Sequence, residues 1–117
     1  MDMENKVRQI RELVEAKREK FARVSDEVWA VPELYFHETK SAAILIKALK
    51  EEGFEVQEGV DGIPTAFIGT WGSGKPVIGI LGEFDALPSL SQEAGCWEHK
   101  EIVKGGPGHG CGHNMFG

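Results

Sequence analysis

Apolar residues in the first part of the chain recur at helical spacing between charged residues. Within residues 4–30 they lie three, four or seven positions apart, which predicts one amphipathic helix that ends close to Pro32. The apolar positions are Val7, Ile10, Val14, Phe21, Val24 and Val28. A second helix is predicted over residues 39–52, where Gly53 can take the left-handed closing position. Its apolar face consists of Ala42, Leu45, Ile46 and Leu49.

Strand patterns follow the two predicted helices. Alternating residues predict short strands at 54–57 and 65–71, and the almost continuous apolar run at 76–81 is typical of a strand that is covered on both faces. Because Gly72-Ser73-Gly74 is a tight-turn sequence, the last two strands are predicted to form an antiparallel hairpin. The predicted fold class is therefore α/β, with two helices preceding a mixed sheet.

The 36 residues from 82 to 117 are rich in Gly, Pro, Ser, Cys and His and show little periodicity. A loop of this length in a compact domain is usually functional or disordered. It finishes at Met115-Phe116-Gly117, where a glycine-rich loop would normally lead into a helix. We therefore expect the chain to be a truncated piece of a longer protein.

Composition and charge narrow the classes of function. The chain has 117 residues, of which 41% are hydrophobic and 27% charged, as in one ordinary globular domain. The net charge is −6, and residues 54–117 hold 3 basic and 8 acidic groups, so a basic stripe for nucleic acid is absent there. No apolar run approaches the roughly 20 residues that span a bilayer, and the charged start lacks the apolar centre of a signal peptide. We expect a cytoplasmic protein with no nucleic-acid or membrane partner, whose Cys96 and Cys111 stay reduced.

Two carboxylates follow the apolar run directly. Glu83 and Asp85 are two residues apart, so in extended backbone their side chains project to the same side. Ligands of open α/β sheets collect beyond the carboxyl ends of the strands. The pair is therefore a candidate for metal binding, for orientation of a metal ligand or for acid/base chemistry. The alternative is that both carboxylates cap a loop or face water.

A second group of donors lies in the glycine-rich segment. Cys111 and His113 are separated by one residue, so a thiolate and an imidazole can converge on one metal ion or on adjacent ones, and His109 adds a third donor. A buried thiol with two surface histidines would account for the same residues. A phosphate-binding loop is a further alternative, although the P-loop and Rossmann glycine patterns are absent. Cys111 could also be a nucleophile with His113 as its base.

Two motifs, in this order and at this spacing, resemble the M20 family of metal-dependent peptidases and amidohydrolases. The first is Gly82-Glu83-Phe84-Asp85-Ala86-Leu87-Pro88, and about 20 residues later comes Gly108-His109-Gly110-Cys111-Gly112-His113-Asn114. Segments 32–34, 53–54, 62–68 and 74–77 also fit, so the likeness covers essentially the whole chain. It is greatest to the p-aminobenzoyl-glutamate hydrolase branch, whose B subunits share Leu-Ser-Gln-x-Ala-Gly-Cys, here residues 90–96.

The resemblance implies that residues 1–117 are the N-terminal part of a catalytic domain, a zinc-peptidase-like α/β/α sandwich, without the lid or dimerisation domain. It implies hydrolysis of the amide of an N-acyl amino acid such as p-aminobenzoyl-glutamate, with two divalent metal ions, zinc or manganese. The metal-binding roles carry over to Cys111 and His113, and orientation of a ligand carries over to Asp85. The full-length protein is expected to be a homodimer or to pair with a homologous subunit.

Two residues depart from the common family pattern. Glu83 stands where many M20 peptidases have a metal-binding His, and Asn114 stands where many relatives have Asp, although the p-aminobenzoyl-glutamate branch also has Asn. Because these residues supply only part of a two-metal site, we expect the isolated chain to bind metal weakly and to show no turnover. The rival hypothesis is a non-catalytic metal-binding or interaction module.

Overall fold

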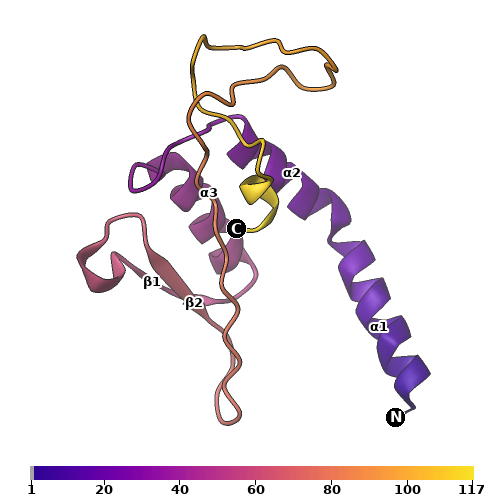
Figure 1. Ribbon diagram of the computed structural model, residues 1–117. Coiled ribbons are helices and arrows are strands. Elements are labelled where there is room, and N and C mark those ends of the chain that lie inside the picture. The colour runs from indigo at the N-terminus through magenta and orange to yellow at the C-terminus, as the bar shows by residue number, and fades with distance from the viewer. Residues whose placement is uncertain (1) are drawn as a thin grey trace.

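The computed structural model describes residues 2–117, and its regular elements all lie before residue 71 apart from one short turn. The helices are α1 (Met3–Ala16), α2 (Arg18–Trp29) and α3 (Thr39–Glu51), followed by β1 (Glu55–Glu58), the 3-10 turn η1 (Val60–Gly62), β2 (Phe67–Thr70) and a second 3-10 turn, η2 (His113–Met115). In Figure 1, α2 and α3 lie side by side, the β1–β2 hairpin lies beyond α3, and α1 extends away from all of them.

The predicted single helix over residues 4–30 is wrong at one position. The helix is interrupted at Lys17, whose backbone (φ −106°, ψ 0°) ends α1 and precedes α2. Lys17 is a charged residue that lies three positions after Val14 and four before Phe21, where the apolar spacing would place a hydrophobic residue. Its ammonium group pairs with Glu52 at the end of α3, and Lys20 pairs with Glu51 and Glu52 at 3.0 and 2.9 Å. The start of α2 is thereby tied to the end of α3.

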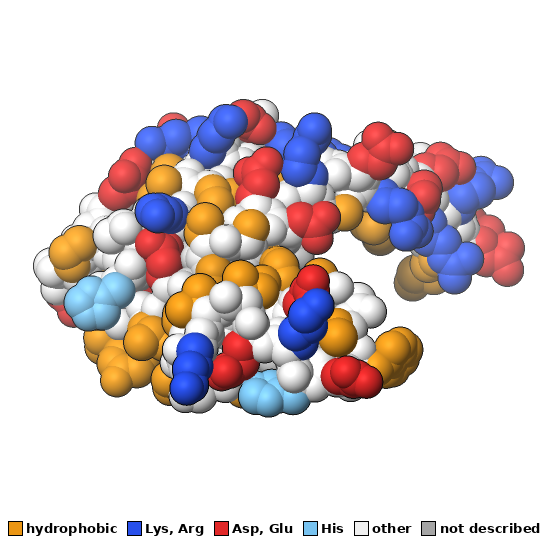
Figure 2. All heavy atoms as spheres, turned by 90° about the horizontal axis from the view of Figure 1, so that it is seen from above, with side chains coloured by type: hydrophobic (Ala, Val, Ile, Leu, Met, Phe, Trp, Pro, Cys, Tyr) orange, Lys and Arg blue, Asp and Glu red, His pale blue; other side chains and the backbone are white. Residues whose placement is uncertain are grey.

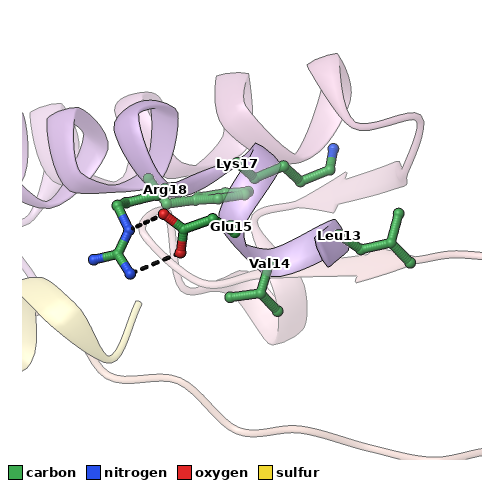
Figure 3. A pocket seen from close by; sticks show the side chains of 6 residues that line it. Leu13, Val14, Glu15, Lys17 and Arg18 are labelled. Carbon is green, nitrogen blue, oxygen red and sulfur yellow. Dashed lines mark hydrogen bonds and ion pairs between the residues drawn. The ribbon is translucent and has the colours of Figure 1, made fainter. Parts of the chain in front are cut away.

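The junction of α1 and α2 carries an open apolar hollow of about 500 Å³ (Figure 3). Leu13, Val14 and Phe21 supply its apolar lining, and the guanidinium group of Arg18 beside it donates two 2.7 Å hydrogen bonds to Glu15. α1 has no buried residue along its length. In Figure 2 it projects from the rest of the molecule as an arm whose visible face is largely charged.

The second predicted helix is confirmed as α3, and Gly53 after it has the expected positive φ of +87°. Because its apolar residues share one face, α3 packs that face against α2 and the hairpin. The small core consists of Val28, Ala42, Leu45, Ala48 and Ala86.

The first two predicted strands are confirmed, with bounds shifted by one or two residues, and the third is wrong. β1 and β2 pair antiparallel with Glu55 opposite Thr70 and Glu58 opposite Phe67. The run at 76–81 forms no strand, and its Val77 and Ile80 are 85% and 94% exposed. The predicted hairpin at Gly72-Ser73-Gly74 is therefore wrong too. Within residues 2–117 the sheet is two-stranded and antiparallel, so the mixed sheet and the α/β/α sandwich are not formed there.

Much apolar surface remains open to solvent. The accessible surface is 9183 Å², whereas a compact monomer of 12.9 kDa exposes about 6,300 Å². The radius of gyration is 16.7 Å, against about 13 Å for a compact chain of this length. Across the described residues, no helix combines the length and the apolar character needed to cross a membrane.

Candidate functional site

Asp85 is held in place through its neighbour Ala86. The N–H of Ala86 donates a 2.8 Å hydrogen bond to the carbonyl oxygen of Glu33, and Leu34 and Ala86 form an isolated parallel bridge. Ala86 is fully buried. The motif around Asp85 is therefore fixed against the segment that joins α2 to α3.

The Glu33 side chain organises the same segment from the other direction. Its carboxylate accepts hydrogen bonds from the N–H groups of Lys40 (3.2 Å) and Ser41 (2.9 Å) and from the Ser41 hydroxyl (3.0 Å). These groups belong to the first turn of α3, which lacks a side-chain cap from Glu38. The sequence did not predict this role, because a cap from seven or eight residues upstream has no local signature.

The loop after Asp85 is closed by a second main-chain pair. Leu87 and Gly108 exchange two 3.0 Å hydrogen bonds, and Ser91 donates to the carbonyl oxygen of Gly106 at 3.0 Å. A Cβ atom on Gly108 would overlap the carbonyl oxygen of Leu90, so only glycine fits there. The two motifs are thus joined directly, Leu87 of the first to Gly108 of the second.

Gln92 closes the outer part of this loop. Its amide donates to the carbonyl oxygen of Glu98 at 2.8 Å and its carbonyl accepts from the N–H of Lys100 at 3.0 Å. The N–H of Glu93 donates to the carbonyl oxygen of Lys100 at 2.8 Å. The stretch at 90–96 therefore shapes a loop, and Trp97 at its outer end is fully exposed.

The second motif ends in η2, which packs against α2. Gly112 has a φ of +83°, which glycine tolerates best, and its carbonyl oxygen accepts from the N–H of Met115 at 3.0 Å. A Cβ atom on Gly82 would lie 2.6 Å from the carbonyl oxygen of Phe116, so the chain entering the first motif runs directly beside the end of this turn. His113 begins η2 and faces the first motif.

The geometry brings together Glu83, Asp85 and His113. Nδ1 of His113 lies 2.8 Å from Oδ1 of Asp85, and Nε2 of His113 lies 3.1 Å from Oε2 of Glu83. The side chains of His113 and Asp85 are 20% and 26% exposed, while that of Glu83 is 60% exposed. A doubly protonated ring donates to both carboxylates. When Nδ1–H donates to Asp85 and Nε2 is unprotonated, the Nε2 lone pair and Glu83 face the same point, which suits a cation.

His109 is buried and makes no hydrogen bond to this cluster. It is 7% exposed, and neither ring nitrogen has a hydrogen-bond partner. Burial lowers the pKa of His109, with a smaller lowering from His113 and partial opposition from the Val28 main chain and Asp85. The Val28 contact falls short of hydrogen-bond geometry. Burial therefore disfavours the charged form of His109.

The remaining donors do not complete a metal cage. Cys96 and Cys111 are free thiols and both are half-buried. In the part of the chain that the structure describes, no group of three or more His, Cys, Asp or Glu side chains is arranged to hold a metal ion. Asn114 is directed to α2, where it binds Ser25. The donors within residues 2–117 therefore fit a metal ion only if further donors join them.

Comparison with known proteins gives three relatives. The chain is 46% identical over 98% of its length to the B subunit of p-aminobenzoyl-glutamate hydrolase from Escherichia coli (strain K12). It is 38% identical over 71% of its length to thermostable carboxypeptidase 2 of Saccharolobus solfataricus, and 33% identical over 96% to thermostable carboxypeptidase 1 of the same organism. The chain spans 24%, 21% and 26% of these relatives' lengths. No protein-family model matches it.

Proposed function

The chain is related by sequence to the M20-type hydrolases and carboxypeptidases, and from this premise we propose that it contributes to a metal-dependent amidohydrolase. The proposed reaction is cleavage of the amide bond of an N-acyl amino acid such as p-aminobenzoyl-glutamate. Because the chain spans about a quarter of its relatives' length, this activity is proposed for the whole protein. The 117 residues alone are proposed to lack turnover.

The observation that carries the proposal is the His113 cluster. A carboxylate on Nδ1 fixes the ring and increases the basicity of Nε2, which is the usual arrangement behind a histidine that binds a metal ion. Asp85 occupies this position at 2.8 Å. On the opposite side of the ring, Glu83 is mostly exposed and can move to share a cation with Nε2.

Each residue of the cluster has a proposed role. His113 binds the metal through Nε2, Asp85 holds the Nδ1 proton and the ring orientation, and Cys111 supplies a thiolate from two residues earlier. Glu83 contributes a carboxylate oxygen or shapes the pocket. Two divalent ions, zinc or manganese, would supply Lewis acidity and an acidified water when bound.

The proposed substrate class and partner follow from the relatives. One is named as a hydrolase of p-aminobenzoyl-glutamate and two as carboxypeptidases, and these activities share hydrolysis of an amide formed by an amino acid. A small N-acyl amino acid is therefore the proposed substrate. The first of these relatives is named as one subunit of its enzyme, which supports pairing with a homologous subunit, and a homodimer is the alternative arrangement.

The second candidate is a non-catalytic metal-binding or interaction module. It needs only the donors present within residues 2–117, which form no group of three that could hold a metal ion. A module of this kind would bind a metal ion through His113 and Cys111 without hydrolysing any N-acyl amino acid, even when joined to the remainder of its natural protein.

Metal content and affinity test the proposal. Zn²⁺ and Mn²⁺ binding would be measured by calorimetry and native mass spectrometry for the wild type, Cys111→Ser, His113→Ala and the control His99→Ala, whose residue is 77% exposed. We expect weak binding that is lost in the first two variants and kept in the control. Binding unchanged in Cys111→Ser and His113→Ala would contradict the metal roles. Hydrolysis of p-aminobenzoyl-glutamate by the full-length protein then separates the amidohydrolase from the module.

A further inference from the structure

A pair of hydrogen bonds joins residues that lie 89 positions apart in the sequence. The side-chain amide of Asn114 donates to the Ser25 hydroxyl oxygen at 2.9 Å and to the Ser25 carbonyl oxygen at 3.4 Å. Both residues are half-buried. A carbonyl oxygen can only accept, so the contact requires the NH₂ group of an asparagine, and an aspartate at this position has no proton to give.

Asn114 is also the immediate neighbour of His113 within a tightly bonded turn. The turn is closed by 3.0 Å hydrogen bonds from Met115 to Gly112 and from Phe116 to His113. Because these bonds hold the backbone of the turn as one body, the Cα–Cβ bonds of neighbouring residues in it change direction together. Fixing Asn114 on α2 therefore fixes the direction in which His113 leaves the turn.

We propose that Ser25 and Asn114 form a positioning clip that sets His113 against Asp85. Asn114 and Ser25 touch no reacting group, so both are positioning residues. The consequence for metal affinity rests on the proposed function, whereas the positioning of the ring does not.

The opposite side of the cluster is anchored to the same part of the molecule. Asp85 is held through Ala86, whose N–H binds the carbonyl oxygen of Glu33. Ser25 and Glu33 lie eight residues apart around the end of α2. Both partners of the 2.8 Å His113–Asp85 contact are thus anchored to one short stretch of the fold, which accounts for the contact between two residues that lie 28 positions apart in the sequence.

Three single variants and one double variant test the clip, with the histidine ring signals of a ¹⁵N–¹H spectrum at one fixed pH as the readout. Asn114→Ala removes both hydrogen bonds, Ser25→Ala removes only the bond to the hydroxyl, and Asn114→Asp keeps the shape but can only accept from the Ser25 hydroxyl. We expect the His113 ring signals to shift most in Asn114→Ala and less in the other two. In the double variant Ser25→Ala/Asn114→Asp, which keeps no hydrogen bond between the two side chains, the shift should be larger than in Asn114→Asp, which carries the same added charge.

Controls separate positioning from general stability. The ring signals of the exposed His99 should stay constant in the same spectra, and the circular dichroism spectrum should keep its helical signal. His113 signals that stay constant in folded Asn114→Ala would overturn the proposal. If that variant does not fold, constant signals in folded Ser25→Ala and Asn114→Asp would overturn it equally.

A zinc titration distinguishes this proposal from the proposed function. We expect Zn²⁺ to bind about tenfold more weakly to Asn114→Ala than to the wild type, as for other residues that orient a metal ligand. A wild type that binds no Zn²⁺ would count against the proposed function alone, because the ring signals still decide the clip. If Asn114→Ala and the wild type bind Zn²⁺ with equal affinity while the His113 ring signals shift, the clip positions the ring only in the metal-free chain. Its predicted effect on Zn²⁺ affinity would then be overturned.

Discussion

The carboxylate of Glu33 binds Ser41 twice, through the main-chain N–H at 2.9 Å and through the hydroxyl group at 3.0 Å. Ser41 is fully buried, so both of its groups depend on this one partner for most of their hydrogen bonding. Glu33 therefore acts as the cap of α3 from outside the helix. The same residue holds Ala86 through its carbonyl oxygen, which a side-chain substitution leaves in place.

Replacing Glu33 tests the cap. We expect Glu33→Ala to lower the free energy of unfolding by about 2 to 3 kcal/mol, because it removes a helix cap and leaves buried Ser41 groups unsatisfied. Glu33→Gln keeps one acceptor oxygen and should lose less. Urea unfolding monitored by circular dichroism measures both. Equal losses in the two variants would contradict the hydrogen-bonding account.

Gly108 is predicted to be irreplaceable in its loop. Gly108→Ala would push a methyl group into the carbonyl oxygen of Leu90, and we expect a loss of about 3 kcal/mol or more. Gly110→Ala is the matched control, because its methyl group would meet only the Leu90 side chain at 3.1 Å. The control should lose less than about 1 kcal/mol. Thermal unfolding of the pair checks the prediction, and similar melting temperatures would refute it.

Two leucine-sized residues should differ sharply in their contribution to stability. Leu45 is buried in α3, and we expect Leu45→Ala to cost about 2 to 4 kcal/mol. Ile80 is 94% exposed, so Ile80→Ser should change the free energy of unfolding by less than about 0.5 kcal/mol. Chemical denaturation of both variants measures the contrast. A large loss in Ile80→Ser would show that the run 76–81 is packed in solution.

The burial of His109 predicts how the free energy of unfolding depends on pH. Burial lowers its pKa in the folded state, so below about pH 6.5 the unfolded chain binds more protons at this residue than the folded chain does. The contribution of His109 to stability is therefore lost as the pH falls through this range, until the pH passes the folded pKa. His109→Leu should lose less stability than the wild type between about pH 7.5 and about pH 5, as measured by urea unfolding. His99→Gln, at an exposed position, should behave as the wild type does.

The two carboxylates around His113 should differ in their effect on metal affinity. Asp85→Asn removes the charge that holds the Nδ1 proton, and we expect about 10- to 100-fold weaker Zn²⁺ binding. Glu83→Gln tests whether the exposed carboxylate is a ligand, because a ligand role also predicts weaker binding. Calorimetry on both variants resolves the two roles. Unchanged affinity in Asp85→Asn would remove the orienting role, and unchanged affinity in Glu83→Gln would leave Glu83 as a pocket residue.

Local sequence pattern predicted the elements that find their partners nearby. α3 was predictable because its apolar residues share a face and Gly53 closes it, and β1 and β2 because they alternate and pair across a short connection. The run 76–81 has the composition of a buried strand but contacts no partner strand within residues 2–117. The predicted first helix extended past Lys17 because the hydrophobic spacing is the same on both sides of the interruption, so the spacing does not reveal it.

Residue chemistry singled out the members of the site, but their supports were not predictable. The motifs marked Glu83, Asp85 and His113 as candidates, and the structure brings these three together, while their metal roles stay a prediction. Ser25 and Glu33 lie outside both motifs and were not candidates. Each acts through hydrogen bonds to residues that are distant in sequence or outside any standard capping pattern, and only the folded chain shows those contacts.

The distribution of hydrogen bonds and burial also sets the order in which parts of the chain open. α1 buries none of its residues, so its amide protons should exchange with solvent at rates close to those of an isolated helix. The end of α2, the first turn of α3 and the two motifs are joined through Ser25, Glu33 and their partners, so we expect them to open together as one cooperative unit. Hydrogen exchange at Ala86 should consequently follow that of Ser41, although 45 positions separate them in the sequence.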